Sequence, residues 1–260
     1  MDAICDDAAA EHAVLDGLVG TLAADDWDRA TPAEGWSIRD QISHLWFFDQ
    51  RASMAMADPP RFEADKAVLL GAGRVTDASV DIGRSMSSEA LLAAWRDDRR
   101  RMLEVARTID PSVRVPWYGP AMGARSFITA RLMETWAHGQ DVADALGVTR
   151  APTPRLKHVA HIGVRARPFS YAIRNMTLPD VDVHVRLAGP AGDEWTWNDP
   201  ASADVVSGSA LGFCLVVTQR RHVSDTDLVV TGEAANEWIG IAQAFAGAPT
   251  SGRPPIDRSS

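Results

Sequence analysis

Apolar positions in the first half of the chain recur every three or four residues, as they do on a helix that is buried along one face. This pattern predicts four long helices, over residues of about 8–24, 37–57, 88–109 and 125–146. The segments between them are less regular. Residues 59–87 are expected to hold a short helix and a loop, and residues 111–123 a loop rich in proline and glycine. Four amphipathic helices with short or irregular connections predict a four-helix bundle.

Sequence signals mark the boundaries of two of these helices. Ser37 with Asp40 three residues later resembles a capping box, so the second helix should begin after Ser37. It should stop before Asp58, which precedes two prolines. Gly147 follows the fourth helix, at the position where glycine commonly ends a helix.

After residue 150 the pattern of apolar positions changes. The stretches VDVHVRLAG and DEWTWND alternate with a period of two around a Gly-Pro-Ala-Gly turn, so they predict a β-hairpin. The other expected elements are helices over residues 154–175, 207–221 and 233–247, the last capped by Gly247, and a strand over residues 227–233.

These elements together predict an α+β protein with two domains. We expect a helical bundle over residues 1–150 and a small α+β domain over residues 151–260. The boundary falls at the proline-rich stretch APTP, and the tail from residue 251 onward is expected to be frayed.

Composition limits the partners that the chain can have. The net charge of −9 argues against a nucleic acid or an anionic membrane, since both attract a basic surface. No apolar run approaches the length of a membrane span, and the acidic N-terminus lacks the features of a signal peptide, so we expect a cytoplasmic protein. Cys5 and Cys214 are too few and too far apart for a disulfide framework, and no feature indicates an oligomeric state.

A stripe of polar residues interrupts the apolar face of the helix expected over residues 125–146. In METWAHGQD, Glu134, His138 and Asp141 follow one another at intervals of four and three, which places them on one face. A carboxylate and an imidazole one turn apart can bind the same metal ion, although a simple surface pair stays open as an alternative. We expect Asp141 to support a ligating histidine by accepting its hydrogen bond, rather than to bind the metal.

A third ligand should come from a facing helix, as in other metal sites inside bundles. His44 is the candidate, because it lies among apolar residues in QISHLWFFD. Such a histidine is usually a hydrogen-bonded core residue, but here a second helix also carries buried polar groups that could satisfy it. Two histidines and one glutamate form an open ligand set for a divalent ion such as zinc, although other divalent metals also accept it.

The segment TPAEGWSIRDQISHL resembles the signature of the DinB-like metal-binding bundles, in which Gly-Trp-Ser opens the second helix and a later histidine binds metal. The Glu134 and His138 pair resembles, more narrowly, the mycothiol-dependent maleylpyruvate isomerase branch, which uses a histidine and Glu-x-x-x-His to bind zinc. The stretches GFCLVVTQRRH and EWIGIAQAFAG are similar to an uncharacterised actinobacterial subfamily of DinB-like proteins. The resemblance implies His44, Glu134 and His138 as the ligands of one divalent ion.

The resemblance also implies a low-molecular-weight thiol, mycothiol or a relative, as co-substrate, and a small electrophilic molecule as the substrate of a transferase or isomerase. A hydrolase whose metal activates water, and a non-catalytic protein that binds metal or a small ligand, stay open as alternatives. Arg220 and Arg221 are candidates to bind a substrate carboxylate through paired hydrogen bonds, or else belong to a solvated helix end.

Overall fold

The computed structural model describes residues 1–73 and 75–257 and confirms the predicted α+β fold. The chain divides into two compact units, Met1–Arg150 and Ala151–Ser260. Within the tail that was expected to be frayed, residues 251–257 contain neither helix nor strand, and residues 258–260 lie outside the described part. Among the described residues, no helix is both long enough and apolar enough to cross a membrane.

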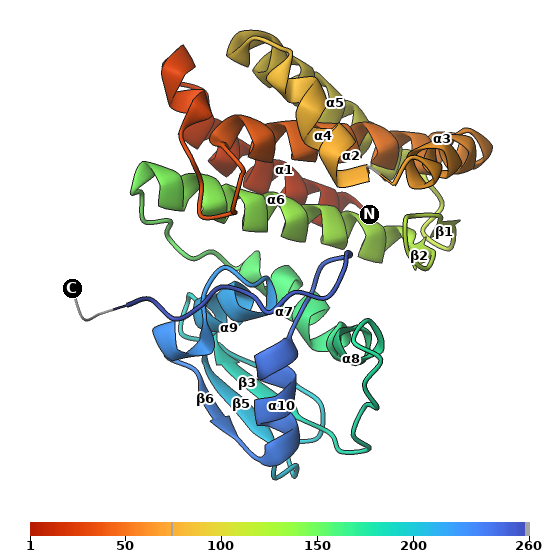
Figure 1. The fold of residues 1–260 in the computed structure, drawn as a ribbon. Coiled ribbons are helices and arrows are strands. Elements are labelled where there is room, and N and C mark those ends of the chain that lie inside the picture. Colours follow the sequence, from red (N-terminus) through yellow and green to blue (C-terminus); the bar gives the residue numbers. More distant parts are fainter. Residues whose placement is uncertain (74, 258–260) are drawn as a thin grey trace. The chain divides into compact units, whose positions relative to one another are not determined.

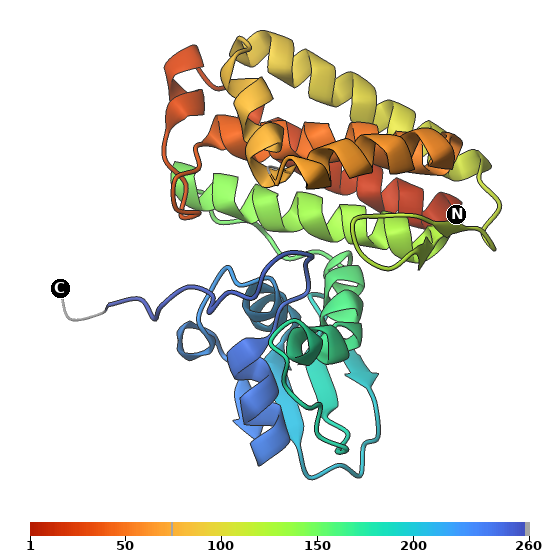
Figure 2. The same ribbon diagram turned by 45° about the vertical axis from the view of Figure 1, so that its right-hand side comes forward.

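The first unit is a four-helix bundle with additional helices on one side (Figure 1). Its elements are α1 (Asp2–Val19), the 3₁₀ helix η1 (Ala24–Asp28), α2 (Ile38–Ala57), α3 (Pro59–Gly71), α4 (Val75–Arg84), α5 (Ser88–Thr108), β1 (Arg114–Val115), β2 (Met122–Gly123) and α6 (Ala124–Leu146). The bundle consists of α1, α2, α5 and α6, and α2 packs against both α5 and α6 (Figure 2). Because α3 and α4 also pack on α2, this helix is central to the unit.

In the first unit, the predicted helix boundaries hold where a capping residue marked them. Ser37 and Asp40 form the capping box, with the Ser37 N–H donating to Asp40 Oδ2 at 2.9 Å and the Asp40 N–H donating to Ser37 Oγ at 3.3 Å. Gly147 ends α6 in the left-handed conformation, with φ of 67°. The first helix begins earlier than predicted, because Ile4 and Cys5 extend its buried face toward the N-terminus.

The prediction of a short helix and a loop over residues 59–87 was wrong, because this segment forms both α3 and α4. Pro59 and Pro60 end α2, but they also occupy the first turn of α3, where proline is well tolerated. The Asp58 side chain caps the new helix by accepting from the N–H of Arg61 at 3.2 Å. The loop expected over residues 111–123 contains the short antiparallel pair of β1 and β2.

The second unit is a four-stranded sheet with helices packed on it. Its elements are α7 (Leu156–Arg165), α8 (Arg167–Ala172), β3 (His184–Ala188), β4 (Glu194–Trp197), β5 (Val205–Ser209), α9 (Ala210–Val217), the 3₁₀ helix η2 (Val223–Asp225), β6 (Val229–Thr231) and α10 (Glu233–Ile241). The strand order is β4-β3-β5-β6, with β3 and β5 parallel and the two outer pairs antiparallel. The predicted hairpin is confirmed as the pair of β3 and β4.

Three predictions in this unit were wrong. The helix expected over residues 154–175 is divided into α7 and α8, because Pro168 lies in the first turn of a new helix that begins at Arg167. Strand β5 was missed because its serines and glycine conceal the alternation of a strand. The last helix ends at Ile241 and not at Gly247, since Gln243 turns away to exchange backbone hydrogen bonds with the Ser170 hydroxyl.

His12 on α1 gives the first unit a pH dependence. Its ring is buried, with 3% exposed, and burial together with the charges of Arg99 and Arg131 lowers its pKa to about 3. The folded protein therefore keeps His12 neutral at pH values where the unfolded chain, with a histidine pKa of about 6.5, binds a proton. The contribution of His12 to stability is complete above about pH 6.5 and is lost as the pH falls toward 3.

Between pH 7 and pH 5, protonation of His12 in the unfolded chain is expected to remove about 2 kcal/mol from the free energy of unfolding. The variant His12→Gln cannot bind this proton. Its free energy of unfolding, measured by urea titration at both pH values, should fall by about 2 kcal/mol less than that of the wild type. An equal fall in the two proteins would contradict the assignment.

Candidate metal centre

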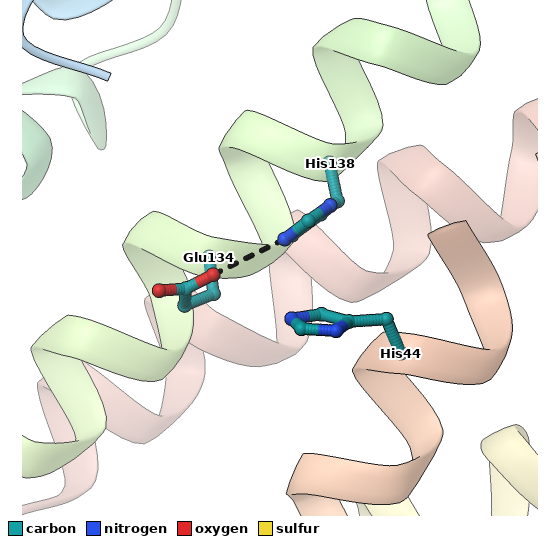
Figure 3. A group of neighbouring side chains, drawn as sticks. All are labelled: His44, Glu134 and His138. Atoms are coloured by element: carbon teal, nitrogen blue, oxygen red, sulfur yellow. Dashed lines mark hydrogen bonds and ion pairs between the residues drawn. The ribbon is translucent and has the colours of Figure 1, made fainter. Parts of the chain in front are cut away.

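Helices α2 and α6 bring together the three residues that were predicted to bind metal (Figure 3). His44 projects from α2, and Glu134 and His138 project from α6, one helical turn apart. The two imidazole rings face each other with their centroids 4.6 Å apart, and His138 Nε2 lies 3.2 Å from Glu134 Oε2. The packing of α2 on α6 therefore creates the cluster from residues 90 or more positions apart in the sequence.

The donor atoms of the cluster are close enough to share one ion. One ligand atom from each of the three residues lies within 4.8 Å of the others. A tetrahedral zinc ion with bonds of about 2.0–2.1 Å requires donor atoms about 3.3 Å apart, so small side-chain rotations suffice. Two imidazole nitrogens and one carboxylate oxygen are a donor set that zinc and related divalent ions accept.

Glu134 is ionised in this setting. Burial raises the pKa of its carboxyl group, but the contact with His138 and the electrostatic interactions with Arg131 and His44 outweigh that effect and lower the pKa to about 2. Its side chain is still 21% exposed, so the carboxylate can move toward a bound ion. A carboxylate that is charged at neutral pH is the form that binds metal.

Each imidazole has a hydrogen-bonding partner on the nitrogen that faces away from the cluster. His138 Nδ1 lies 2.6 Å from Gln41 Oε1, and His44 Nδ1 lies 3.0 Å from Ser79 Oγ. Both partners were missed from the sequence. Gln41 precedes His44 by three residues on α2, so helix spacing could have identified it. Ser79 could not have been identified, because it lies on α4, which was not predicted.

Aromatic rings cover the histidines on the side of α2. Trp36, just before the helix, stacks on His138 with the planes 15° apart and the centroids separated by 5.9 Å. Its ring is also 5.1 Å from His44, and Phe48 approaches His44 to 4.6 Å. These contacts keep water from the ring faces, and a low local dielectric strengthens the electrostatic interactions of the cluster.

The other predicted residues lie elsewhere. Asp141 is buried in α6, 1% exposed, but the partner that the structure shows for His138 Nδ1 is Gln41, so a supporting role for Asp141 stays a prediction. Arg220 and Arg221 follow α9 in the second unit. Arg220 Nη1 donates to the Thr218 carbonyl at 2.6 Å, and Arg221 Nη1 donates to the Arg220 carbonyl at 2.7 Å. Their role in binding a carboxylate also stays a prediction.

Comparisons with known proteins agree with this architecture. The chain is 46% identical over 249 residues to an uncharacterized protein of Mycobacterium tuberculosis, found in two strains, with 95% of this chain and 96% of the relative covered. The crystal structure of the mycothiol-dependent maleylpyruvate isomerase, and that of a variant with one histidine replaced by alanine, match with a TM-score of 0.60. They cover 96% of this chain and 95% of theirs at 15% identity, so this likeness concerns the fold. Residues 8–143 match the mycothiol maleylpyruvate isomerase N-terminal domain, and the chain belongs to that family.

Proposed function

We propose that this protein is a divalent-metal-dependent enzyme that uses a low-molecular-weight thiol, mycothiol or a relative, to isomerise a small electrophilic substrate or to form a thioether with it. The observation that carries the proposal is the cluster of His44, Glu134 and His138 inside a bundle of the mycothiol maleylpyruvate isomerase family. The solved structure that shares this fold is that of a mycothiol-dependent enzyme, which supports mycothiol as the thiol.

The cluster fits the chemistry that thiol activation requires. His44, Glu134 and His138 would hold a divalent ion, most simply zinc, and leave a coordination position for a thiol. Such an ion supplies a Lewis acid that lowers the pKa of a bound thiol, so that the reactive thiolate forms at neutral pH. The negative charge of Glu134 offsets one of the two positive charges of the ion, and Trp36 and Phe48 shield the imidazole faces from water.

The cysteines of the chain support an external thiol. Cys5 and Cys214 are both fully buried, and burial raises the pKa of each thiol. A buried thiol with a raised pKa is a poor nucleophile. The sulfur that attacks an electrophile is therefore expected to come from a bound thiol, not from the protein. Arg220 and Arg221 remain part of the proposal as candidate residues for a substrate carboxylate.

Thiol dependence is the property that tests this function. Zinc-loaded protein should be assayed with maleylpyruvate and with other small α,β-unsaturated acids, with and without mycothiol, and with glutathione as a control thiol. We expect turnover that requires a thiol and that stops when a chelator removes the metal. Turnover without any thiol would favour the metal-dependent hydrolase instead. Metal binding without turnover of any substrate would favour the binding protein.

A further inference from the structure

We propose that Gln41 and Ser79 are positioning residues, which hold a hydrogen on Nδ1 of each imidazole and thereby direct the Nε2 lone pairs of His44 and His138 toward Glu134. The inference rests on the metal site of the proposed function and adds how the protein prepares that site. A neutral imidazole carries its hydrogen on one of its two nitrogens, and only the other nitrogen can bind a metal. The partner of each Nδ1 therefore decides whether Nε2 is available.

A short chain of hydrogen bonds fixes the orientation of the Gln41 side chain. The Thr31 hydroxyl donates to the Trp36 carbonyl at 2.9 Å, so Thr31 Oγ1 can only accept from Gln41, whose Nε2 lies 2.9 Å away. The amide group must then present its oxygen to His138 Nδ1, at 2.6 Å. An amide oxygen only accepts hydrogen bonds, so Nδ1 of His138 must be the donor.

Glu134 competes for the same hydrogen from the other side of the ring. It lies 3.2 Å from His138 Nε2, whereas the Gln41 oxygen lies 2.6 Å from Nδ1. If the only hydrogen lay on Nε2, the lone pairs of His138 Nδ1 and Gln41 Oε1 would face each other across the 2.6 Å between these atoms. The contact is buried, so no water could relieve that repulsion. The Glu134 carboxylate is farther from the ring, at 3.2 Å, and its side chain is 21% exposed. It can therefore turn away from a lone pair on Nε2, whereas the buried amide of Gln41 cannot turn away from Nδ1. The Gln41 contact therefore decides where the hydrogen lies.

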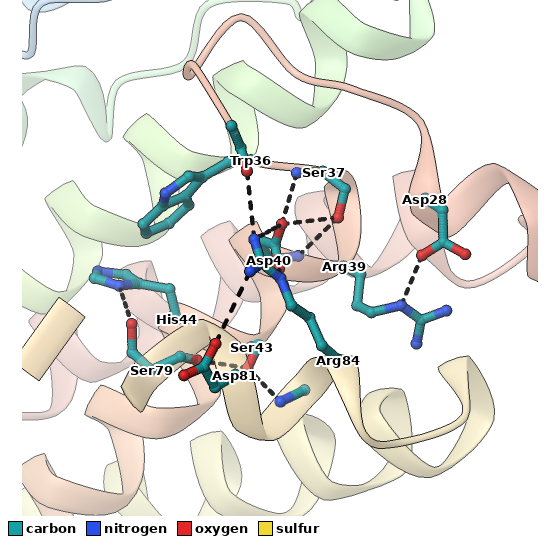
Figure 4. Close-up of polar contacts among 12 residues, drawn as sticks. Asp28, Trp36, Ser37, Arg39, Asp40, Ser43, His44, Ser79, Asp81 and Arg84 are labelled. Atoms are coloured by element: carbon teal, nitrogen blue, oxygen red, sulfur yellow. Dashed lines mark hydrogen bonds and ion pairs between the residues drawn. The ribbon is translucent and has the colours of Figure 1, made fainter. Parts of the chain in front are cut away.

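Ser79 acts on His44 in the same way. The Ser79 hydroxyl donates its single hydrogen to the Thr76 carbonyl at 2.6 Å. Its oxygen can then only accept from His44 Nδ1, 3.0 Å away (Figure 4). The lone pair of His44 is left on Nε2, as it is in His138.

The docking of α4 on α2 brings Ser79 to this place. The Ser43 hydroxyl donates to the Ser79 carbonyl and accepts from the Gly83 N–H at 3.1 Å, and Arg84 holds Asp40 at 2.8 Å (Figure 4). A Cβ atom at position 83 would lie 2.3 Å from the Ser43 side chain, so a glycine is required for this approach. The hydrogen-bonding partner of His44 thus depends on how closely two helices pack.

The test combines zinc affinity with the position of the hydrogen on each ring. Gln41→Leu removes the acceptor for His138, and Ser79→Ala removes the acceptor for His44. Gln41→Glu keeps an acceptor at that position. Gln50→Leu and Ser53→Ala are matched controls on α2, because Gln50 contacts Asp98 and Ser53 contacts the Asp49 carbonyl, not the cluster. Circular dichroism establishes that each variant is folded.

We expect zinc to bind 10- to 100-fold more weakly to Gln41→Leu and to Ser79→Ala, measured by competition with a chelator, and not to either control. In metal-free protein at pH 8.5, ¹⁵N NMR of labelled histidine should show hydrogen on Nδ1 of both rings. This hydrogen should move to Nε2 in His138 of Gln41→Leu and in His44 of Ser79→Ala, but should stay in Gln41→Glu.

Two results would overturn the inference. One is a wild type whose ring hydrogens lie on Nε2, and the other is unchanged zinc affinity together with unchanged ring hydrogens in Gln41→Leu and Ser79→Ala. Either result leaves the proposed function intact if zinc binds and a thiol is required for turnover. Conversely, a wild type without zinc affinity but with hydrogen held on Nδ1 by Gln41 and Ser79 would refute the proposed function and support the positioning roles.

Discussion

Replacing His44 or Glu134 with alanine is expected to weaken binding of the divalent ion so far that the purified variants lose it, whereas the wild type should hold about one ion per chain. Structural zinc sites with four ligands bind with about 10–16 kcal/mol, so each ligand is worth about 2.5–4 kcal/mol. Loss of one of three ligands should therefore weaken binding by a factor of about 70 to 800. Elemental analysis of purified protein, before and after loading with zinc, measures the stoichiometry.

The same two variants should lose thiol-dependent turnover together with the metal. His161→Ala is a suitable control, because His161 accepts a hydrogen bond from Trp197 Nε1 in the second unit and is not part of the cluster. It should bind zinc as the wild type does. A folded wild type that binds no metal after loading would mean that the polar stripe of α6 is a buried hydrogen-bonding network. The non-catalytic alternative would then rank above the enzyme.

The candidate ligands could be predicted from the sequence because the spacing of residues along a helix determines which side chains lie on the same face. The interval of four residues between Glu134 and His138 places both on one face of α6, whatever the rest of the chain does. His44 stood out as a histidine within an apolar stripe, and the Gly-Trp-Ser resemblance supported it. The structure brings all three together, with one donor atom of each within 4.8 Å of the others.

The surroundings of the cluster could not be predicted in the same way, because they depend on contacts between distant segments. Ser79 reaches His44 only because α4 packs on α2, and α4 lies in the segment 59–87, for which only a short helix and a loop were predicted. Strand β5 was missed because its serines and glycine conceal the alternation of a strand, and its parallel partner β3 is not adjacent to it in the sequence and so gives no local signal. The pattern of apolar residues predicts single helices and strands, but which of them contact each other depends on tertiary packing.

A second large effect is expected in the buried core next to the metal cluster. Arg131 on α6 donates from Nη2 and Nε to Asp49 Oδ1 on α2, at 2.8 and 3.1 Å, and both side chains are at most 5% exposed. Burial raises the pKa of Asp49 even though Arg131 opposes that shift. The cost of removing the Asp49 carboxylate from water therefore outweighs its attraction to Arg131, so the ion pair as a whole is expected to add little to the stability of the fold. Removing either residue alone is nevertheless destabilising, because the remaining charge loses its ion-pair partner while it stays buried.

Asp49→Ala is accordingly expected to lower the free energy of unfolding by about 3–5 kcal/mol, because it leaves the Arg131 guanidinium buried without the carboxylate to which it donates. Arg131→Met should cost less, since Asp49 can bind a proton and become neutral. The double variant Asp49→Leu/Arg131→Met removes both charges and should recover most of the loss of Asp49→Ala. Urea unfolding of the four proteins measures these differences.

The exposed pair of Arg100 and Asp97 on α5 is the matched control, since both side chains are 67% exposed and Arg100→Met should change stability by less than about 1 kcal/mol. If Asp49→Ala lost no more than Arg100→Met, the Arg131 charge would have to be reached by water, contrary to its burial. If the double variant were as unstable as Asp49→Ala, the loss would come from packing and not from charge. Recovery in the double variant would establish that the ion pair adds no net stability to the packing of α2 on α6, the same interface that brings His44 to Glu134.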